Sequence, residues 1–221
     1  MPDPATARPR VRDGIRAALP LAPSPILFGL SYGVLADATG FGAAAAVVMS
    51  ATTFAGAAQF ASISVLDAGG TIAAAVLAAI FLNARYVAIS VTVASIFPGG
   101  KLRRLVESQA IVDESWALSG RQGRFEWPIL VGSGLVFYVL WVGCTAIGTA
   151  IGGVLEDPNA LGLDAAFAAL FLALAVPYLR EPRARQAAAL AAVITLVLTP
   201  FAPAGVPIIA ASAACLLGLR R

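Results

Sequence analysis

The chain has 221 residues, of which 59% are hydrophobic and 12% are charged. A soluble domain carries about 25% charged residues, so this composition excludes an ordinary soluble protein and predicts an all-α polytopic membrane protein of one domain. The net charge of +3 does not indicate nucleic-acid binding, because the charged residues lie between apolar runs and act there as orientation signals.

The residue types that carry most metal and acid–base chemistry are scarce. The chain has no histidine, and its two cysteines, Cys144 and Cys215, lie in apolar runs without CxxC spacing. Histidine is the commonest metal ligand and catalytic base, and closely spaced cysteines are the usual zinc ligands. The apolar runs also offer no facing pair of acids. We therefore expect no metal, no cofactor and no enzymatic activity.

Residues 1–16 hold four arginines and no apolar run, and we expect a short, basic, cytoplasmic tail. A small-residue pattern at 36–38 raises the alternative of a cleaved signal peptide. The apolar stretch before it is longer than a signal h-region and contains three prolines, so we do not expect cleavage. The first span is then Ala17–Ala36, kinked because each proline removes a backbone donor.

The second apolar run, Gly42–Leu66, carries a small and polar stripe. Thr52, Gly56 and Gln59 fall at i, i+4 and i+7, which places them on one helical face. One interpretation is close packing against another helix. The other is a helix break at Gly56 whose free backbone groups, together with the Gln59 amide, line a substrate site. Both can hold at once.

The third run, Thr71–Phe97, is apolar except for the sequence NARY at 83–86. Arg85 lies halfway along it, at a depth where an arginine costs about 2.5–3.5 kcal/mol on insertion scales. A chain keeps such a group when it faces the protein interior, a wet cavity or an anion. Arg85 is therefore either a structural ion-pair partner or a residue that binds a solute.

The residues around Arg85 point in more than one direction. Asn83, Tyr86 and Ser90 share one helical face, whereas Arg85 lies about 200° from Asn83 on a regular helix. Either the helix is irregular here, or Asn83 and Arg85 serve different neighbours.

Residues 98–126 form the one long polar interval, and we expect them in the cytoplasm. Lysine and arginines alternate with leucine and valine from Lys101, which predicts an amphipathic helix at the membrane surface. Asp113 and Glu114 follow. They are either solvated surface acids, or one of them pairs with Arg85 or binds a substrate ammonium group.

Four more apolar segments bring the total to about seven, some of them broken or re-entrant: Trp127–Ile151, Leu163–Leu179, Gln186–Thr199 and Gly205–Leu219. The first of these is rich in glycine, which permits close crossing of another helix. The last two are short for a bilayer core of about 30 Å, so they are short spans with little tilt or a hairpin. The C-terminus is expected in the cytoplasm.

The charges conflict with a simple topology. Three apolar runs separate the basic segments 1–16 and 98–126, yet both prefer the cytoplasmic side. Three full crossings cannot place them on the same side. We favour a re-entrant segment at 42–66, because glycines interrupt and bound it. The alternative is seven full spans with a translocated N-terminal tail.

Several motifs in order resemble the AzlC family, the large subunit of bacterial branched-chain amino-acid exporters. The matching pieces are GIRAALP at 14–20, FGLSYGVL at 28–35, FAGAAQF at 54–60, NARY at 83–86, DES at 113–115, and LD at 163–164 leading into ALFLAL at 169–174. The resemblance covers nearly the whole chain.

The resemblance implies a secondary permease of the inner membrane that exports branched-chain amino acids together with a small AzlD-type membrane subunit. The substrate-binding candidates are Thr52, Phe54, Gly56, Gln59, Asn83, Arg85 and Tyr86. Asp113 and Glu114 are candidates for proton coupling. The alternatives are a structural subunit that does not itself transport, and a passive channel.

Overall fold

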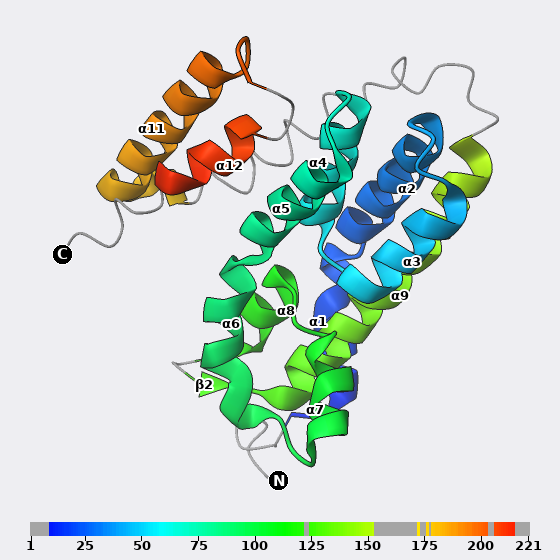
Figure 1. Cartoon of the computed structure of the whole chain (residues 1–221). Helices are drawn as coiled ribbons and strands as arrows, with labels where there is room; N and C mark the ends of the chain where they lie inside the picture. Colours follow the sequence, from blue (N-terminus) through cyan, green and yellow to red (C-terminus); the bar gives the residue numbers. More distant parts are fainter. Residues whose placement is uncertain are drawn as a thin grey trace, which may run out of the picture.

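The computed structural model describes residues 9–121, 124–152, 172, 176, 178–202 and 206–214 (Figure 1). These residues are mostly α-helical, as predicted. The N-terminal part comprises α1 Val11–Ala18, η2 Leu19–Leu21, α2 Pro23–Ala38, α3 Ala43–Thr53, α4 Gly56–Asp67, α5 Ile72–Asn83, α6 Arg85–Val93 and η3 Ala94–Ile96. It is followed by α7 Lys101–Ser108, α8 Asp113–Ser119, β1 Gly120–Arg121, β2 Arg124–Phe125, α9 Trp127–Gly152, η5 Tyr178–Arg180, α11 Pro182–Leu198 and α12 Val206–Ser212.

Two helical stretches among the described residues are long and apolar enough to cross a membrane. They are Ile72–Ile96 and Trp127–Gly152, and the bent pair Val11–Leu21 and Pro23–Ala38 makes a third. The predicted span Leu163–Leu179 lies mostly outside the described residues, and only part of Gly205–Leu219 is described. The predicted total of seven apolar segments is therefore not confirmed.

Helix α9 is the central element, because α1 and α2 pack along it backbone to backbone. The residue numbers of the contacts increase in the same direction on both partners: Gly14 contacts Ile129, Gly33 contacts Gly148, and Asp37 contacts Gly152. The helices therefore run parallel. A Cβ atom at Gly33 would overlap the Thr145 carbonyl oxygen. Small residues let two helix backbones approach this closely. This confirms the role expected of Gly132 and Gly148, whereas Gly134 meets Ala110 in a turn and nothing lies within 4 Å of a Cβ atom at Gly143.

The first apolar segment is bent by 66°, at the proline-rich stretch between η2 and α2. This agrees with the predicted kink. The basic tail, however, ends earlier than expected, because Val11–Ala18 is already helix α1. Gly14 and Ala18 are buried on the face of α1 that packs on α9, while Arg12 and Arg16 are exposed. Burial of this face accounts for the helix in a stretch read as a tail.

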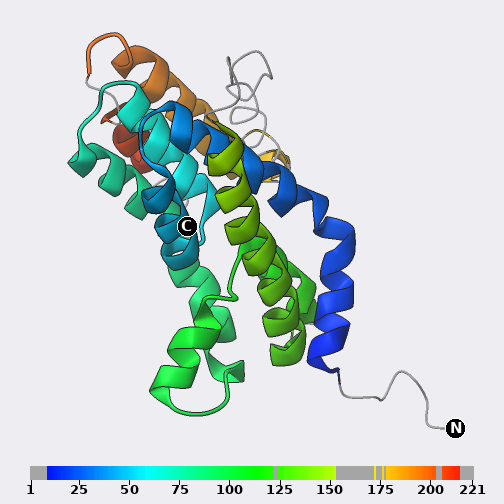
Figure 2. The same cartoon turned by 90° about the vertical axis from the view of Figure 1, so that its right-hand side faces the viewer.

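Helices α3 and α4 form a dip that begins and ends at the same end of the molecule. Both views show α3 running inward from the end of α2, and α4 returning to that end (Figures 1 and 2). The reversal occurs at Phe54 and Ala55, where Phe54 has a left-handed backbone with φ 41°. A turn at 68–70 then leads into α5, which packs on α4 through Val65, Ala75 and Ala78.

This dip removes the conflict in the charge pattern. Because α3 and α4 do not carry the chain across, α1 and α7 lie at the same end of the molecule (Figures 1 and 2). The two basic segments can then share one side of a membrane, as the positive-inside rule requires. The structure thus has the geometry of the re-entrant interpretation of residues 42–66.

The polar interval holds more structure than the predicted amphipathic helix. Helix α7 exposes Leu102, Leu105 and Val106, the apolar side chains expected on a membrane surface. Helix α8 is followed by a two-stranded hairpin in which Gly120 pairs with Phe125. The prediction of an all-α chain missed this hairpin, whose strands are only two residues long and carry no alternating pattern.

The glycine contact between α2 and α9 gives a first prediction. Gly33→Ala should lower the stability by about 1–3 kcal/mol, because the added methyl group overlaps the α9 backbone. Thermal unfolding of the purified protein in detergent measures this. Gly143→Ala is the matched control on α9, since nothing lies within 4 Å of its Cβ position. Equal unfolding temperatures for the two variants would contradict the close contact.

Candidate functional site

Arg85 follows a break in its span. Helix α5 ends at Asn83, and α6 begins at Arg85. Around the break the backbone bonds tighten to i,i+3, from Ala84 N to Phe81 O and from Val87 N to Ala84 O. The helix is therefore irregular here, and Asn83 and Arg85 also line different cavities. Both explanations drawn from the sequence therefore apply: the helix is irregular, and Asn83 and Arg85 have different neighbours.

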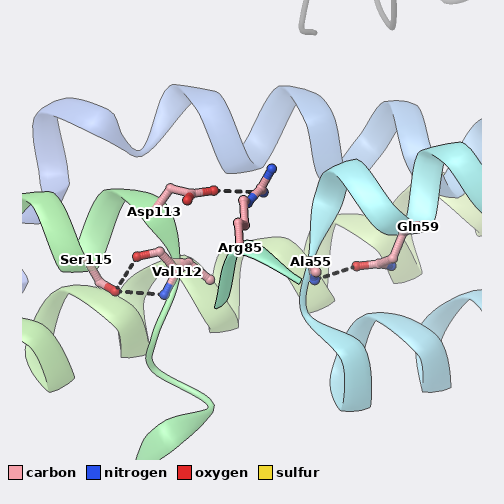
Figure 3. A network of polar contacts seen from close by, with 6 residues as sticks. All are labelled: Ala55, Gln59, Arg85, Val112, Asp113 and Ser115. Atoms are coloured by element: carbon pink, nitrogen blue, oxygen red, sulfur yellow. Dashed lines mark hydrogen bonds and ion pairs between the residues drawn. The ribbon is translucent and has the colours of Figure 1, made fainter. Parts of the chain in front are cut away.

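The Arg85 guanidinium pairs with Asp113 of α8. The Nη2 to Oδ2 distance is 2.8 Å, and the two side chains are 36% and 35% exposed (Figure 3). The Tyr86 ring lies beneath the guanidinium, 5.2 Å from Cζ. Arg85 Nε is buried without a hydrogen-bond partner among the described residues. The structural ion pair is thus present, and the guanidinium retains donor capacity.

The start of α8 is held in place by Ser115, which is fully buried. Its hydroxyl accepts a hydrogen bond from the Val112 N–H at 3.0 Å (Figure 3). It donates to the Ala110 carbonyl at 2.6 Å. This local bonding fixes the first turn of the helix and therefore the direction in which Asp113 points. The DES motif thus supplies both an ion-pair partner and the residue that orients it.

A first cavity of about 80 Å³, called the charged cavity here, lies beside this ion pair. Its polar lining includes Arg85, Asp113 and Glu114. Its apolar lining includes the rings of Phe28, Phe54, Phe137 and Trp141, from α2, the α3–α4 reversal and α9. Gly56 and Ala57, at the start of α4, also line it. Charged groups therefore face apolar rings across one small space.

Gln59 does not line either cavity, although the sequence suggested a place in the substrate site. Its side chain is fully buried, and its Oε1 accepts a hydrogen bond from the Ala55 N–H at 3.2 Å (Figure 3). The same oxygen accepts a second hydrogen bond from Trp141 Nε1 at 3.0 Å. Its Nε2 donates to Ser50 Oγ at 2.8 Å, and that hydroxyl bonds to Thr145. Gln59 therefore joins the α3–α4 reversal to α9.

Gly56 allows the Trp141 ring to reach this reversal. A Cβ atom at Gly56 would lie 2.8 Å from Cη2 of Trp141. The same ring stacks on Tyr32 at a centroid distance of 6.3 Å. The packing interpretation of the stripe is thus right for Gly56. The expected break exists too, but it lies at Phe54–Ala55, just before Gly56.

A second cavity of about 260 Å³, called the neutral cavity here, lies on the other side of Phe54 and Tyr86. It contains four predicted site residues, Thr52, Phe54, Asn83 and Tyr86. The rest of its lining is Thr53, Ser90, Ser108, Gln109 and Ile111. No charged side chain lines it among the described residues. The predicted face of Asn83, Tyr86 and Ser90 therefore opens on this cavity, and of the three only Tyr86 also lines the charged cavity.

Burial raises the pKa of Glu114, which belongs to α8, outside the membrane-spanning segments. Desolvation is the largest cause, and the nearby Asp113 charge adds to it, while a backbone hydrogen bond and Arg85 oppose it. Glu114 lines the charged cavity and its side chain is exposed, so the protein atoms around the carboxyl group desolvate it only in part. The site therefore favours the protonated form of Glu114, one of the two predicted coupling residues, relative to an ordinary carboxyl group.

Sequence reasoning missed the aromatic wall. Phe137 and Trp141 lie in the apolar run that became α9, and Phe28 lies in α2. An aromatic residue in an apolar span carries no signal of its own, since it looks the same facing lipid, core or cavity. An indole N–H in an apolar run was the one available hint for Trp141, because a buried indole needs a partner.

The fold and the cavities together define a class. The protein is an α-helical membrane protein with a half-crossing helix pair and an internal site that combines charges with aromatic rings. Membership follows from sequence comparison: the family model described as "AzlC protein" matches residues 20–155, more than half of the chain. The chain therefore belongs to the AzlC family, whose members have a transport-related role at the membrane.

Relatives agree with this membership. An uncharacterised membrane protein of Archaeoglobus fulgidus is 32% identical over 179 residues, which cover 80% of this chain and 79% of the relative. An uncharacterised membrane protein of Helicobacter pylori is 24% identical over 176 residues, covering 78% and 77%. No solved structure matches the fold.

The ion pair gives a second prediction. Asp113→Asn should cost about 1–3 kcal/mol, between the values for exposed and for buried pairs, because each partner is about a third exposed. Arg85→Gln with Asp113→Asn should recover most of this loss, since no unpaired charge remains. Unfolding in detergent of the wild type, both single variants and the double variant measures the coupling. Simple additivity of the two losses would contradict the pairing.

The raised pKa of Glu114 gives a third prediction. A carboxyl group whose pKa is higher in the folded state binds its proton more tightly there, so stability falls as pH rises above its ordinary value of 4.5. Glu114→Gln should therefore unfold at a higher temperature than wild type at about pH 8, and this gain should vanish toward low pH. Glu181→Gln, an exposed site on α11, is the control. A gain independent of pH would contradict the assignment.

Proposed function

We propose that this chain is a secondary permease that exports branched-chain and other apolar amino acids across the bacterial cell membrane. It acts as the large subunit beside a small AzlD-type membrane protein. The observation that carries the proposal is the charged cavity, in which Arg85, Asp113 and Glu114 face four aromatic rings. Family membership supports a transport role, and the resemblance supports the substrate class.

The cavity offers each part of such a substrate a suitable group. Arg85 binds the carboxylate, assisted by the unpaired N–H groups at the start of α4, where Gly56 and Ala57 line the cavity. Asp113 and Glu114 face the ammonium group. The aromatic wall takes an aliphatic side chain, which gains from leaving water.

The site must open for an amino acid to enter. Its volume of about 80 Å³ is well below the roughly 300–1,000 Å³ of a typical ligand pocket. In addition, Asp113 already occupies the Arg85 guanidinium. The substrate carboxylate therefore replaces Asp113 at Arg85 as the surrounding helices separate. The two helix breaks, at Phe54–Ala55 and at Ala84, are the places where this movement is easiest.

The orientation belongs to the proposal as well. Residues 98–126 and the C-terminus lie in the cytoplasm, because the basic segments prefer that side. The common placement of α1 and α7 at one end supports the same side for the N-terminus.

Efflux from cells fed a leucine- or methionine-containing dipeptide tests the proposal. The chain and the small AzlD-type protein are expressed separately and together. Together they should lower the internal free amino acid, and neither should do so alone. Collapse of the proton gradient should stop this efflux if transport is active and not channel-like. Unchanged internal levels in every combination would refute the substrate assignment.

The same assay gives a fourth prediction, on Arg85. Arg85→Ala should abolish efflux while leaving membrane insertion intact, because the carboxylate loses its charged partner. Arg85→Lys should retain part of it, since a point charge replaces a bidentate donor. Arg104→Ala removes an exposed arginine of α7 and serves as the control. Normal export by correctly inserted Arg85→Ala protein would refute the solute role of this residue.

A further inference from the structure

The charged cavity and the neutral cavity touch at only two residues. Phe54 and Tyr86 line both, and every other lining residue belongs to one cavity alone. The two spaces differ in chemistry, since one holds an arginine and two acids and the other holds hydroxyl and amide groups. Two aromatic side chains therefore separate a charged space from a larger uncharged one.

Each of these two residues sits at a break in its helix. Phe54 lies at the reversal between α3 and α4, and it is the one non-glycine residue with a positive φ among the described residues. A left-handed conformation at a bulky residue is strained, and such strain clusters at ligand clamps and switches. Its ring is 6% exposed and packs edge-on against Tyr138 at 5.1 Å.

Tyr86 comes two residues after Ala84, where α5 gives way to α6. Its ring carries the Arg85 guanidinium on one face, so its position depends on the ion pair in the charged cavity. A change at Arg85 therefore reaches the wall of the neutral cavity through direct contact. Tyr86 is therefore placed to link occupancy of the charged cavity to access from the neutral cavity.

The neutral cavity is built to hold a polar guest or water. Its volume of about 260 Å³ has room for several water molecules. Asn83 lines this cavity, and its Oδ1 atom is buried without a hydrogen-bond partner among the described residues. A buried acceptor left unpaired is costly, so it takes a hydrogen from water or from a guest such as an ammonium group.

We propose that Phe54 and Tyr86 are the gate between two stations of one solute path, the neutral cavity being the hydrated station outside the charged site. The guest of the neutral cavity is a small zwitterion, held by neutral hydroxyl and amide groups. The inference rests on the proposed function for the identity of the guest, but the gate itself is a property of access and can be measured without transport.

The location fits a station on the side of the basic segments. Ser108, Gln109 and Ile111 line the neutral cavity and belong to the polar interval, whose helix α7 lies at the basic end (Figure 1). Thr52, Thr53 and Gln109 are exposed, so the cavity opens toward the exterior of the chain. Ala57, at the start of α4, lines the charged cavity alone and is buried, whereas Ser24 on the same cavity is exposed.

Cysteine labelling gives the fifth prediction. Ser90→Cys reports on the neutral cavity and Ala57→Cys, at a buried residue, on the charged cavity, each in a chain carrying Cys144→Ala and Cys215→Ala. A charged, membrane-impermeant methanethiosulfonate reagent is applied to the face from which Ser90→Cys reacts. From that face, Ala57→Cys should react at least about tenfold more slowly than Ser90→Cys. Removing the Phe54 ring should bring its rate close to that of Ser90→Cys.

Phe54→Gly is the suitable substitution, because glycine adopts a positive φ without strain, so loss of the ring is separated from backbone damage. Tyr86→Ala is the second variant and should act in the same direction. Phe81→Ala, which removes an exposed ring that lines neither cavity, is the matched control and should leave both rates unchanged. Folding of each variant is checked by a monodisperse elution profile.

The gate is refuted if Ala57→Cys reacts as fast as Ser90→Cys in the otherwise unaltered chain. It is also refuted if folded Phe54→Gly and Tyr86→Ala proteins both keep the slow rate. Failure of the proposed function looks different, because the efflux assay then shows no amino-acid export while the labelling rates still follow the two rings. A solute that protects Ser90→Cys from the reagent identifies the guest directly.

Discussion

A single cation in an apolar span is the constraint around which this structure is arranged. Arg85 lies in the stretch Ile72–Ile96, where an unpaired arginine costs about 2.5–3.5 kcal/mol on insertion scales. The span itself cannot meet this cost, since its other side chains are almost all apolar. The helix breaks at Ala84, and α8 brings Asp113 to 2.8 Å from the guanidinium. A segment outside the span thus neutralises a charge within it.

The need to enclose Arg85 explains why α9 serves both the scaffold and the site. Its glycines allow the backbones of α1 and α2 to pack closely, which brings the cavity-lining residues of α2 and α9 near one another. Its Trp141 donates to Gln59 and so fixes the α3–α4 reversal, while the ring face of Trp141 lines the cavity. Irregular backbone at membrane depth survives only when it is buried in protein in this way.

The sequence predicted those features that carry a large, local free-energy cost, such as a charge in an apolar run. It did not predict features that depend on which way an apolar side chain faces. Arg85 stood out because a charge in an apolar run needs a reason, and the re-entrant dip followed from the sidedness of the basic segments. The face of Thr52, Gly56 and Gln59 assumed one continuous helix, whereas the chain reverses at Phe54–Ala55, close to the break expected at Gly56. The burial of Gln59 was not foreseen. Phe137 and Trp141 carry no polar pattern that would assign them to a cavity.

Charge balance at Arg85 connects solute and proton in the proposed transport. In the structure one guanidinium faces two carboxyl groups, one of which it pairs, and burial already favours the protonated form of the other, Glu114. A solute carboxylate that takes the place of Asp113 at Arg85 adds a third acid to the same small space. Like charges at this range disfavour one another, and we therefore propose that a proton binds to this site together with the solute. In this proposal, departure of the solute restores the ion pair and releases that proton, which makes the pairing of Arg85 with Asp113 the step at which transport and proton movement are linked.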